Sequence, residues 1–167
     1  MLTTDQKGAI AEQAIALEAM RNGVGVFRPL GDERYDLIFD IGSRLLRIQC
    51  KWSGQIGEVI VVRTRRSRRG PEGLIHRHYE PDEIDAVAAY CPETGRCYLL
   101  PHELSVGRAA VQLRLSPTRN NQATGIQWAR DYELGATLQA FRGPIAQLGE
   151  RVHGMHEVAG SIPAGST

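Results

Sequence analysis

Residues Arg34–Ser53, RYDLIFDIGSRLLRIQCKWS, decide the fold because they contain a complete strand-turn-strand pattern. Two short apolar runs, residues 35–41 and 45–48, are joined by a turn at Gly42-Ser43. Alternating apolar runs joined by a tight glycine-containing turn are typical of an antiparallel β-hairpin. The segment therefore predicts two paired strands at the centre of the domain.

Three polar side chains converge in this hairpin. If the strands pair about the turn, Asp36 lies near Gln49 across the ladder, and the two-residue period of a strand places Gln49 and Lys51 on one face. A carboxylate with further oxygen ligands suits a hard divalent cation such as Mg2+. A nearby lysine can position a water or stabilise charge that develops on a phosphate. Cys50, between them, is expected to point into the core as a small buried hydrophobe.

The order of these residues resembles the PD-(D/E)XK nuclease superfamily, whose pattern is an Asp, a spacer and an acid-x-Lys triplet. In this chain Asp36 precedes Gln49-Cys50-Lys51, and Glu12 falls on a preceding helix where many members carry another acid. The likeness is to the branch that includes group I intron homing endonucleases, which is known for Gln in place of the second acid.

The resemblance implies a fold, an activity and a set of site residues. The fold is α/β, a restriction-endonuclease-like core with a central mixed β-sheet flanked by helices. The activity is that of a Mg2+-dependent, homing-type endonuclease that hydrolyses DNA phosphodiester bonds. Asp36, Gln49 and Glu12 are the implied metal ligands, and Lys51 orients the attacking water, so these four residues form the candidate catalytic set.

Two other functions remain open. A Holliday-junction resolvase or repair-type nuclease shares this core and differs in the shape of its substrate. A catalytically decayed DNA-binding protein is the other alternative, in which Gln49 marks a lost site. Cleavage of double-stranded DNA with one site per subunit implies a homodimer or a higher symmetric oligomer.

Basic residues are concentrated next to the hairpin. The whole chain has a formal net charge of +1, but residues 44–78 contain nine Arg or Lys and two Glu, a local charge of +7. A basic patch of this kind suits a polyanionic partner, although a plain solvated surface is the alternative. The candidate DNA-contacting residues are Arg63, Arg65, Arg66, Arg68, Arg69 and Arg77, together with Arg119, Asn120, Asn121 and Gln122. The segment RTRRSRRGPEG is expected to be a flexible loop.

Apolar periodicity predicts the remaining elements. A helix starts at Thr4 and ends near Gly23, with an apolar stripe of Ile10, Ala14, Leu17 and Met20. The expected strands are residues 24–28, 59–64 as a third strand of the meander, 84–90 paired with 97–100, and 111–115 as an edge strand. Residues 81–83 and 101–104 are expected to form helical turns, and residues 128–141 a helix.

Length and composition are those of one globular domain. The chain has 167 residues, of which 42% are hydrophobic, and we place the nuclease domain at residues 1–142. Residues 143–167 are expected to be an unstructured tail, because IAQLGE and GSIP back-translate to sequences like the D and TψC arms of a transfer-RNA gene. Three cysteines and the lack of a leader-like start favour a reducing cytoplasm, and no stretch has the roughly 18 apolar residues of a membrane span.

Overall fold

The hairpin at residues 34–53 forms as the sequence predicts. In the computed structural model its strands are β2 (Leu37–Asp40) and β3 (Leu45–Trp52), which pair antiparallel with Leu37 opposite Ile48. Gly42 has a φ of 89°, in the left-handed region that favours glycine, and its amide donates to the Asp40 carboxylate at 2.8 Å. The structure describes residues 1–70, 73–77, 79–117 and 125–142.

This hairpin lies inside a mixed five-stranded sheet. The other strands are β1 (Gly25–Phe27), β8 (Ala86–Cys91) and β9 (Arg96–Pro101). The order is β1-β2-β3-β8-β9, in which β3 and β8 are parallel and all other neighbours antiparallel. The predicted central mixed sheet and the hairpin of β8 and β9 are therefore confirmed. The turn between β8 and β9 lies at residues 92–95.

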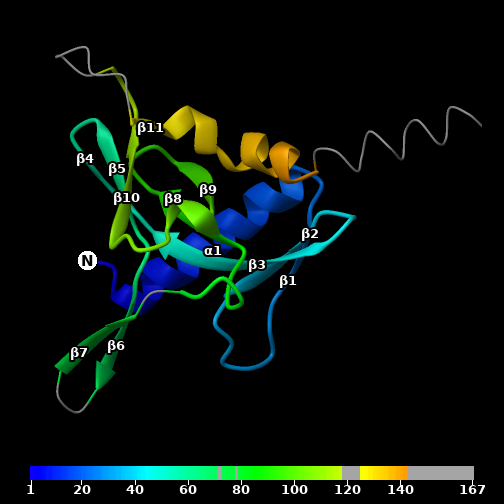
Figure 1. The fold of residues 1–167 in the computed structure, drawn as a ribbon, viewed down its shortest axis with the longest axis horizontal. Helices are drawn as coiled ribbons and strands as arrows, with labels where there is room; N and C mark the ends of the chain where they lie inside the picture. The colour runs from blue at the N-terminus through cyan, green and yellow to red at the C-terminus, as the bar shows by residue number, and fades with distance from the viewer. Residues whose placement is uncertain (71–72, 78, 118–124, 143–167) are drawn as a thin grey trace, which may run out of the picture.

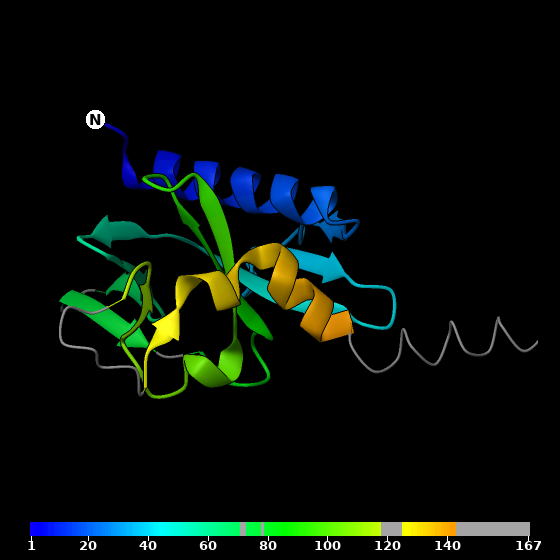
Figure 2. The ribbon, with the colours of Figure 1, turned by 90° about the horizontal axis from the view of Figure 1, so that it is seen from above.

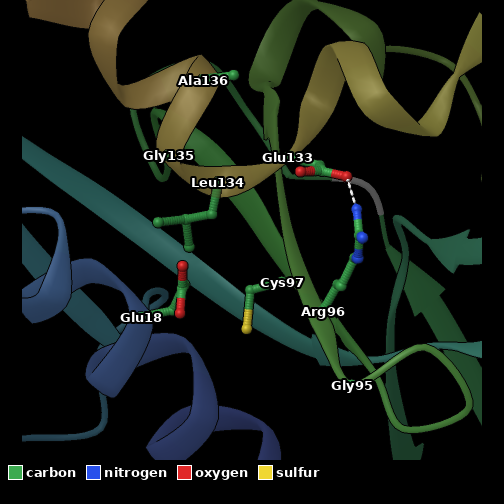
Figure 3. A pocket seen from close by; sticks show the side chains of 8 residues that line it. All are labelled: Glu18, Gly95, Arg96, Cys97, Glu133, Leu134, Gly135 and Ala136. Atoms are coloured by element: carbon green, nitrogen blue, oxygen red, sulfur yellow. Dashed lines mark hydrogen bonds and ion pairs between the residues drawn. The ribbon is translucent and has the colours of Figure 1, made fainter.

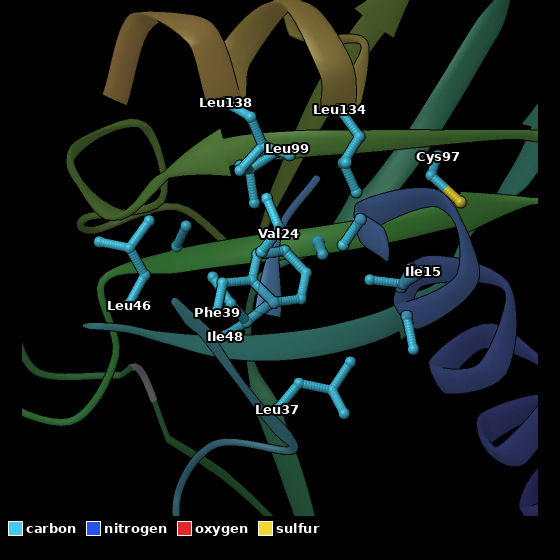
Figure 4. Packing of buried hydrophobic residues seen from close by; sticks show 14 of the residues in the cluster. Ile15, Val24, Leu37, Phe39, Leu46, Ile48, Cys97, Leu99, Leu134 and Leu138 are labelled. Atoms are coloured by element: carbon cyan, nitrogen blue, oxygen red, sulfur yellow. The ribbon is translucent and has the colours of Figure 1, made fainter. Parts of the chain in front are cut away.

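Two helices cover one face of this sheet (Figures 1 and 2). The first is α1 (Thr4–Arg21), whose N-cap is Thr3 in a capping box with Gln6, and the second spans residues 134–142. Leu134 and Leu138 of the second helix join the core cluster of the sheet (Figure 4). A Cβ at Gly135 would lie 2.7 Å from Oδ1 of Asn22 at the end of α1, so a larger residue here would displace that side chain.

The predicted apolar stripe of α1 is wrong. Ile10, Leu17 and Met20 are exposed, whereas the fully buried positions are Ala11, Ile15, Ala16 and Ala19. The helix therefore turns Ala11, Ile15, Ala16 and Ala19 toward the sheet in place of the predicted stripe, and three of these four side chains are small.

A second sheet covers the opposite face. It consists of β4 (Gly54–Ile56), β5 (Val59–Arg63), β10 (Ala110–Arg114) and β11 (Gln127–Trp128), in the order β11-β10-β5-β4. The strand β5 is thus not a third strand of the β2–β3 meander, because it pairs with β4 and β10 and the parallel strand β8 takes the place beside β3. Nor is β10 an edge strand, since β11 pairs with its outer side. Buried residues of β5 and β10 pack against β8 and β9.

The arginine-rich segment forms a hairpin, not a loop. Strands β6 (Arg66–Gly70) and β7 (Gly73–Arg77) pair antiparallel as a separate two-stranded sheet that projects from the body (Figure 1). The predicted helix at residues 128–141 also begins differently. Its first residues form β11 and the 3-10 helix η2 (Ala129–Tyr132), and the α-helix starts at residue 134.

The remaining local predictions give mixed results. Residues 81–83 form a turn without a helix, whereas His102–Leu104 forms the expected helical turn, η1. All three cysteines are buried and free. The proposed tail, residues 143–167, lies outside the described residues. Nowhere in the described part of the chain is a helix long and apolar enough to cross a membrane.

Candidate active site

Asp36 and Gln49 meet at the start of β2, as the hairpin register predicts. The Asp36 amide donates to the Ile48 carbonyl oxygen at 2.9 Å, which extends the ladder by one residue beyond β2. Oδ2 of Asp36 accepts a hydrogen bond from the Cys50 amide at 2.7 Å and another from the Gln49 side-chain amide. The carboxylate is thereby fixed against β3 by two donors.

Lys51 lies on the same face of β3. Residues 47, 49 and 51 alternate with Leu46, Ile48 and Cys50, which belong to the core under α1. Nζ of Lys51 lies 3.1 Å from the phenol oxygen of Tyr79 and 5.3 Å from the centroid of its ring. The structure therefore gathers the acid, the amide and the ammonium group around one polar spot.

The segment that carries Tyr79 is fastened to β3 by an ion pair. The Arg47 amide and guanidinium donate to Asp85 at 2.7, 3.0 and 3.1 Å, and the guanidinium also binds the Asp82 carbonyl oxygen. Asp85 returns a backbone hydrogen bond to the Arg47 carbonyl oxygen at 2.9 Å. A second ion pair joins Arg34 and Glu83 at 3.4 Å.

Glu12 belongs to the helix that covers the other face of the sheet. It lies on α1 and forms an ion pair at 2.7 Å with Arg28, the residue that follows β1. Burial raises the pKa of the Cys50 thiol well above its usual range, and the charges of Asp36 and Glu12 raise it further. Both carboxylates thus lie within electrostatic reach of the same thiol. The positive charges of Arg28 and Lys51 lower the pKa of this thiol.

The donor set fits a magnesium ion with few protein ligands. Mg2+ usually takes one or two carboxylates and keeps several waters. Asp36 supplies one carboxylate and Glu12 a second if it releases Arg28. Gln49 donates to Asp36 through its amide nitrogen, and the oxygen of the same amide group remains an acceptor that could face an ion. Within the described ranges, no three His, Cys, Asp or Glu side chains form a metal-binding cluster.

The candidate DNA-contacting residues are only partly described. Arg63 and Arg65 are exposed at the end of the strand β5. The backbones of Arg66, Arg68, Arg69 and Arg77 lie on the β6–β7 hairpin, in which Arg66 pairs with Arg77. Residues 119–122 lie outside the described ranges. The structure thus places a run of basic residues next to the segment that carries Tyr79.

A pocket on the helical face contains none of the predicted site residues. It has a volume of about 270 Å3 and lies between α1, β9 and residues 133–136, with Glu18 and Cys97 at its wall (Figure 3). An ion pair between Arg96 and Glu133 crosses its rim. Burial raises the pKa of the Cys97 thiol to about 12, with a further contribution from the Glu18 charge, so Cys97 is not a nucleophile at neutral pH.

Sequence reasoning missed three residues at the site: Arg28, Tyr79 and Asp85. Asp85 and Tyr79 are far from β3 along the chain and reach it only through the parallel pairing of β3 with β8. Arg28 is the last residue of the strand predicted at residues 24–28 and directly follows β1. An acid on a helix with an arginine at the end of the next strand was the one signal that could have suggested the pair.

The family is established by comparison with known proteins. The chain belongs to the PD-(D/E)XK endonuclease family, whose model matches residues 2–135. The predicted resemblance and its restriction-endonuclease-like core are therefore confirmed, and the chain is a member of a nuclease family.

Two solved structures resemble this chain. The bacterial homing endonuclease I-Ssp6803I is 29% identical, with a TM-score of 0.65, and the match covers 90% of this chain and 97% of that one. The Holliday junction resolvase Hjc of the hyperthermophile Archaeoglobus fulgidus is 14% identical, with a TM-score of 0.39 and coverage of 65% and 84%. No curated protein matches the chain.

Proposed function

We propose that this chain is a Mg2+-dependent endonuclease of the homing type that hydrolyses phosphodiester bonds in double-stranded DNA. The observation that carries the proposal is the convergence of Asp36, Gln49 and Lys51 on one face of the β2–β3 hairpin. Membership of an endonuclease family supports it. Similarity to a bacterial homing endonuclease over 97% of the length of that protein favours the homing type over the resolvase alternative.

Each residue of the site has a chemical role in the proposed reaction. Asp36 is held rigidly by the Cys50 amide and the Gln49 side chain, so its carboxylate does not need to reorganise when substrate binds. The Lys51 ammonium group orients the attacking water and stabilises negative charge on the phosphate. Glu12 completes the set once DNA phosphate competes for its partner, Arg28.

Asp36, Gln49 and Glu12 are the residues that would hold the ion. When bound, Mg2+ supplies Lewis-acid stabilisation and lowers the pKa of a coordinated water. A neutral amide in place of a second acid brings less negative charge to the site. We therefore expect weaker metal binding than in a site with two acids beside the lysine.

In the proposed complex, the basic hairpin β6–β7 and Arg63 bind the DNA backbone. Arginine side chains neutralise phosphates and guide a polyanion toward the site. We assign base contacts to residues 119–122, whose amide and guanidinium groups suit base edges. Because a subunit has one candidate site, cutting both strands favours a homodimer or a larger symmetric assembly.

The test is cleavage of plasmid DNA. The protein should nick and linearise plasmid with Mg2+ and should not cleave it when a chelator is present. Lys51→Ala should lower the single-turnover cleavage rate by about 10²–10³-fold while DNA affinity and melting temperature stay near wild type. Lys7→Ala is the matched control, since it removes the same charge from α1 and should cleave at about the wild-type rate.

Three outcomes would contradict the proposal. Cleavage by Lys51→Ala at the wild-type rate would show that Lys51 does not belong to the active site. DNA binding by the wild-type protein without cleavage under any metal would favour the decayed DNA-binding alternative. Faster cleavage of a four-way junction than of linear duplex would favour the resolvase alternative.

A further inference from the structure

We propose that Tyr79 is a positioning residue for Lys51, and that its phenol oxygen holds the ammonium group at the candidate site. The inference rests on the proposed function, because holding Lys51 matters for activity only if Lys51 acts on the phosphodiester. Tyr79 belongs to neither the metal-ligand set nor the basic surface.

The contact between the two side chains suits this role. Nζ of Lys51 lies 3.1 Å from the Tyr79 phenol oxygen, a hydrogen bond with a charged donor, and 5.3 Å from the ring centroid. Lysine has a flexible four-carbon side chain, so a fixed acceptor limits the positions that the ammonium group samples. A group already in place when the substrate arrives needs less reorganisation in the transition state.

Tyr79 is itself held rigidly. It is only 6% exposed and belongs to the core cluster that contains Ile84, Val87 and Ala89. Val87 and Ala89 lie opposite Gln49 and Lys51 in the parallel pair of β3 and β8. The ring therefore packs on the face of the sheet where Lys51 lies, and its polar oxygen faces the ammonium group.

The backbone around Tyr79 is anchored to the same strand as Lys51. The ion pair of Arg47 with Asp85 binds the end of segment 79–85 to β3, and a second ion pair joins Glu83 in its middle to Arg34, which precedes β2. Arg47 and Lys51 lie on one face of β3, four residues apart in the sequence. The segment is thus fixed to β3 at two places, one at the ion pair and one at the Lys51–Tyr79 contact.

Removing only the phenol oxygen tests the inference. Tyr79→Phe keeps the ring and its packing but deletes the acceptor. The single-turnover cleavage rate at saturating enzyme should fall about 10–100-fold, the loss expected for a hydrogen bond to a charged group. The DNA dissociation constant, measured without Mg2+, and the melting temperature should stay near wild type. A cleavage rate equal to that of wild type would overturn the inference.

Tyr98→Phe is the matched control. Tyr98 is 1% exposed and lies in the same core cluster, but its hydroxyl group lies 3.4 Å from the Thr94 hydroxyl group and has no contact with Lys51 in the described structure. The cleavage rate of Tyr98→Phe should equal that of wild type. An equal loss in Tyr98→Phe and Tyr79→Phe would overturn the inference, because the loss would then reflect the core and not Lys51.

A double variant separates this inference from the proposed function. If Tyr79 acts through Lys51, then Lys51→Ala with Tyr79→Phe should cleave no more slowly than Lys51→Ala alone. Losses that multiply would overturn the positioning role. An inactive Lys51→Ala together with a fully active Tyr79→Phe would overturn only this inference. A fully active Lys51→Ala would overturn both.

Discussion

The hairpins β2–β3 and β6–β7 are both antiparallel pairs, but the first lies inside a five-stranded sheet and the second forms a sheet of its own. In β2–β3, one face of each strand is buried under α1, so a slip of one residue would expose Leu46 and Ile48 and bury Gln49. The hairpin β6–β7 forms a sheet of two strands on its own, and β6 consists of Arg, Ser and Gly only. An isolated pair of strands is marginally stable. Burial thus fixes the register of the first, whereas the second is a pair of strands outside the two larger sheets.

Under the proposed function, this difference separates two tasks. The buried hairpin fixes Asp36, Gln49 and Lys51 against one another, which chemistry at a single phosphate requires. The projecting hairpin carries arginines, and contacts with the DNA backbone require charge more than fixed geometry. We expect substitutions in β2–β3 to change stability or rate, and substitutions in β6–β7 to change the affinity for DNA.

The largest expected effect is on stability, in the buried hairpin. Ile48 is fully buried, so Ile48→Ala should lower the free energy of unfolding by about 2–5 kcal/mol. Leu45, on the same strand and 60% exposed, is the matched control, and Leu45→Ala should change that free energy little. Urea unfolding measures both. Similar losses in the two variants would mean that burial does not set the stability of β3.

The second effect concerns the projecting hairpin. Replacement of Arg65, Arg66, Arg68 and Arg69 by Ala should leave the free energy of unfolding nearly unchanged and weaken DNA binding on every sequence. Each lost phosphate contact flattens the slope of log affinity against log salt by about 0.9, so four contacts change it by up to about three to four units. Binding isotherms at several salt concentrations measure this slope.

Two results would contradict this division of labour. If the slope of log affinity against log salt did not change, the arginines of the hairpin would not contact phosphates, and the hairpin would be a solvated surface. If sequence preference were lost while the slope stayed the same, these arginines would contact base edges. We assign base contacts to residues 119–122. Arg21→Ala is a control for general charge loss, since Arg21 is exposed at the end of α1 and pairs only with nearby Glu18 among the ion pairs of the described residues.

The same comparison explains which parts of the structure the sequence could predict. The alternation in residues 34–53 indicated the β2–β3 register, and with it the meeting of Asp36 and Gln49, because one face had to be buried. No such alternation exists in the arginine-rich segment, so its hydropathy suggested a loop. Its pairing depends on backbone hydrogen bonds, which side-chain patterns do not report.

Partners from distant parts of the chain could not be predicted. Tyr79 and Asp85 reach β3 because β8 adds beside it in parallel, and nothing local in either segment indicates that pairing. The buried face of α1 was missed for a different reason. Ala11, Ala16 and Ala19 rank below Ile10 and Leu17 in hydrophobicity, but small side chains fit where the helix lies close to the sheet.

A smaller effect on the free energy of unfolding is expected in the segment that follows the hairpin β6–β7. The segment between β7 and β8 is bound to β3 through Asp85. Burial favours its protonated form, but hydrogen bonds from the Arg47 side chain and backbone outweigh this, so the pKa of Asp85 lies below its ordinary value. Asp85→Asn should lower the free energy of unfolding by on the order of 1 kcal/mol at neutral pH.

The effect of pH on this variant gives a second check. A carboxyl group whose pKa is lower in the folded than in the unfolded protein stabilises the fold above its unfolded pKa of about 3.9. That stabilisation is lost as the pH falls through the lower, folded pKa. The difference between wild type and Asp85→Asn should therefore be constant near neutral pH and shrink below about pH 4. A difference that does not change with pH would mean that the charge of Asp85 is not responsible.

The smallest expected effect is that of removing residues 143–167. The core contacts of the last described helix come from Leu134 and Leu138, and the Arg142 side chain donates to the Gly23 carbonyl oxygen at 2.9 Å. A chain that ends at Arg142 keeps all of these contacts, so its melting temperature and cleavage rate should match those of the full chain. A chain that ends at Glu133 loses both leucines, each 1% exposed, and should be strongly destabilised. If the chain ending at Arg142 also melted at a much lower temperature, the domain would extend beyond residue 142. Residues 143–167 would then contribute to stability, as the buried hairpin β2–β3 does.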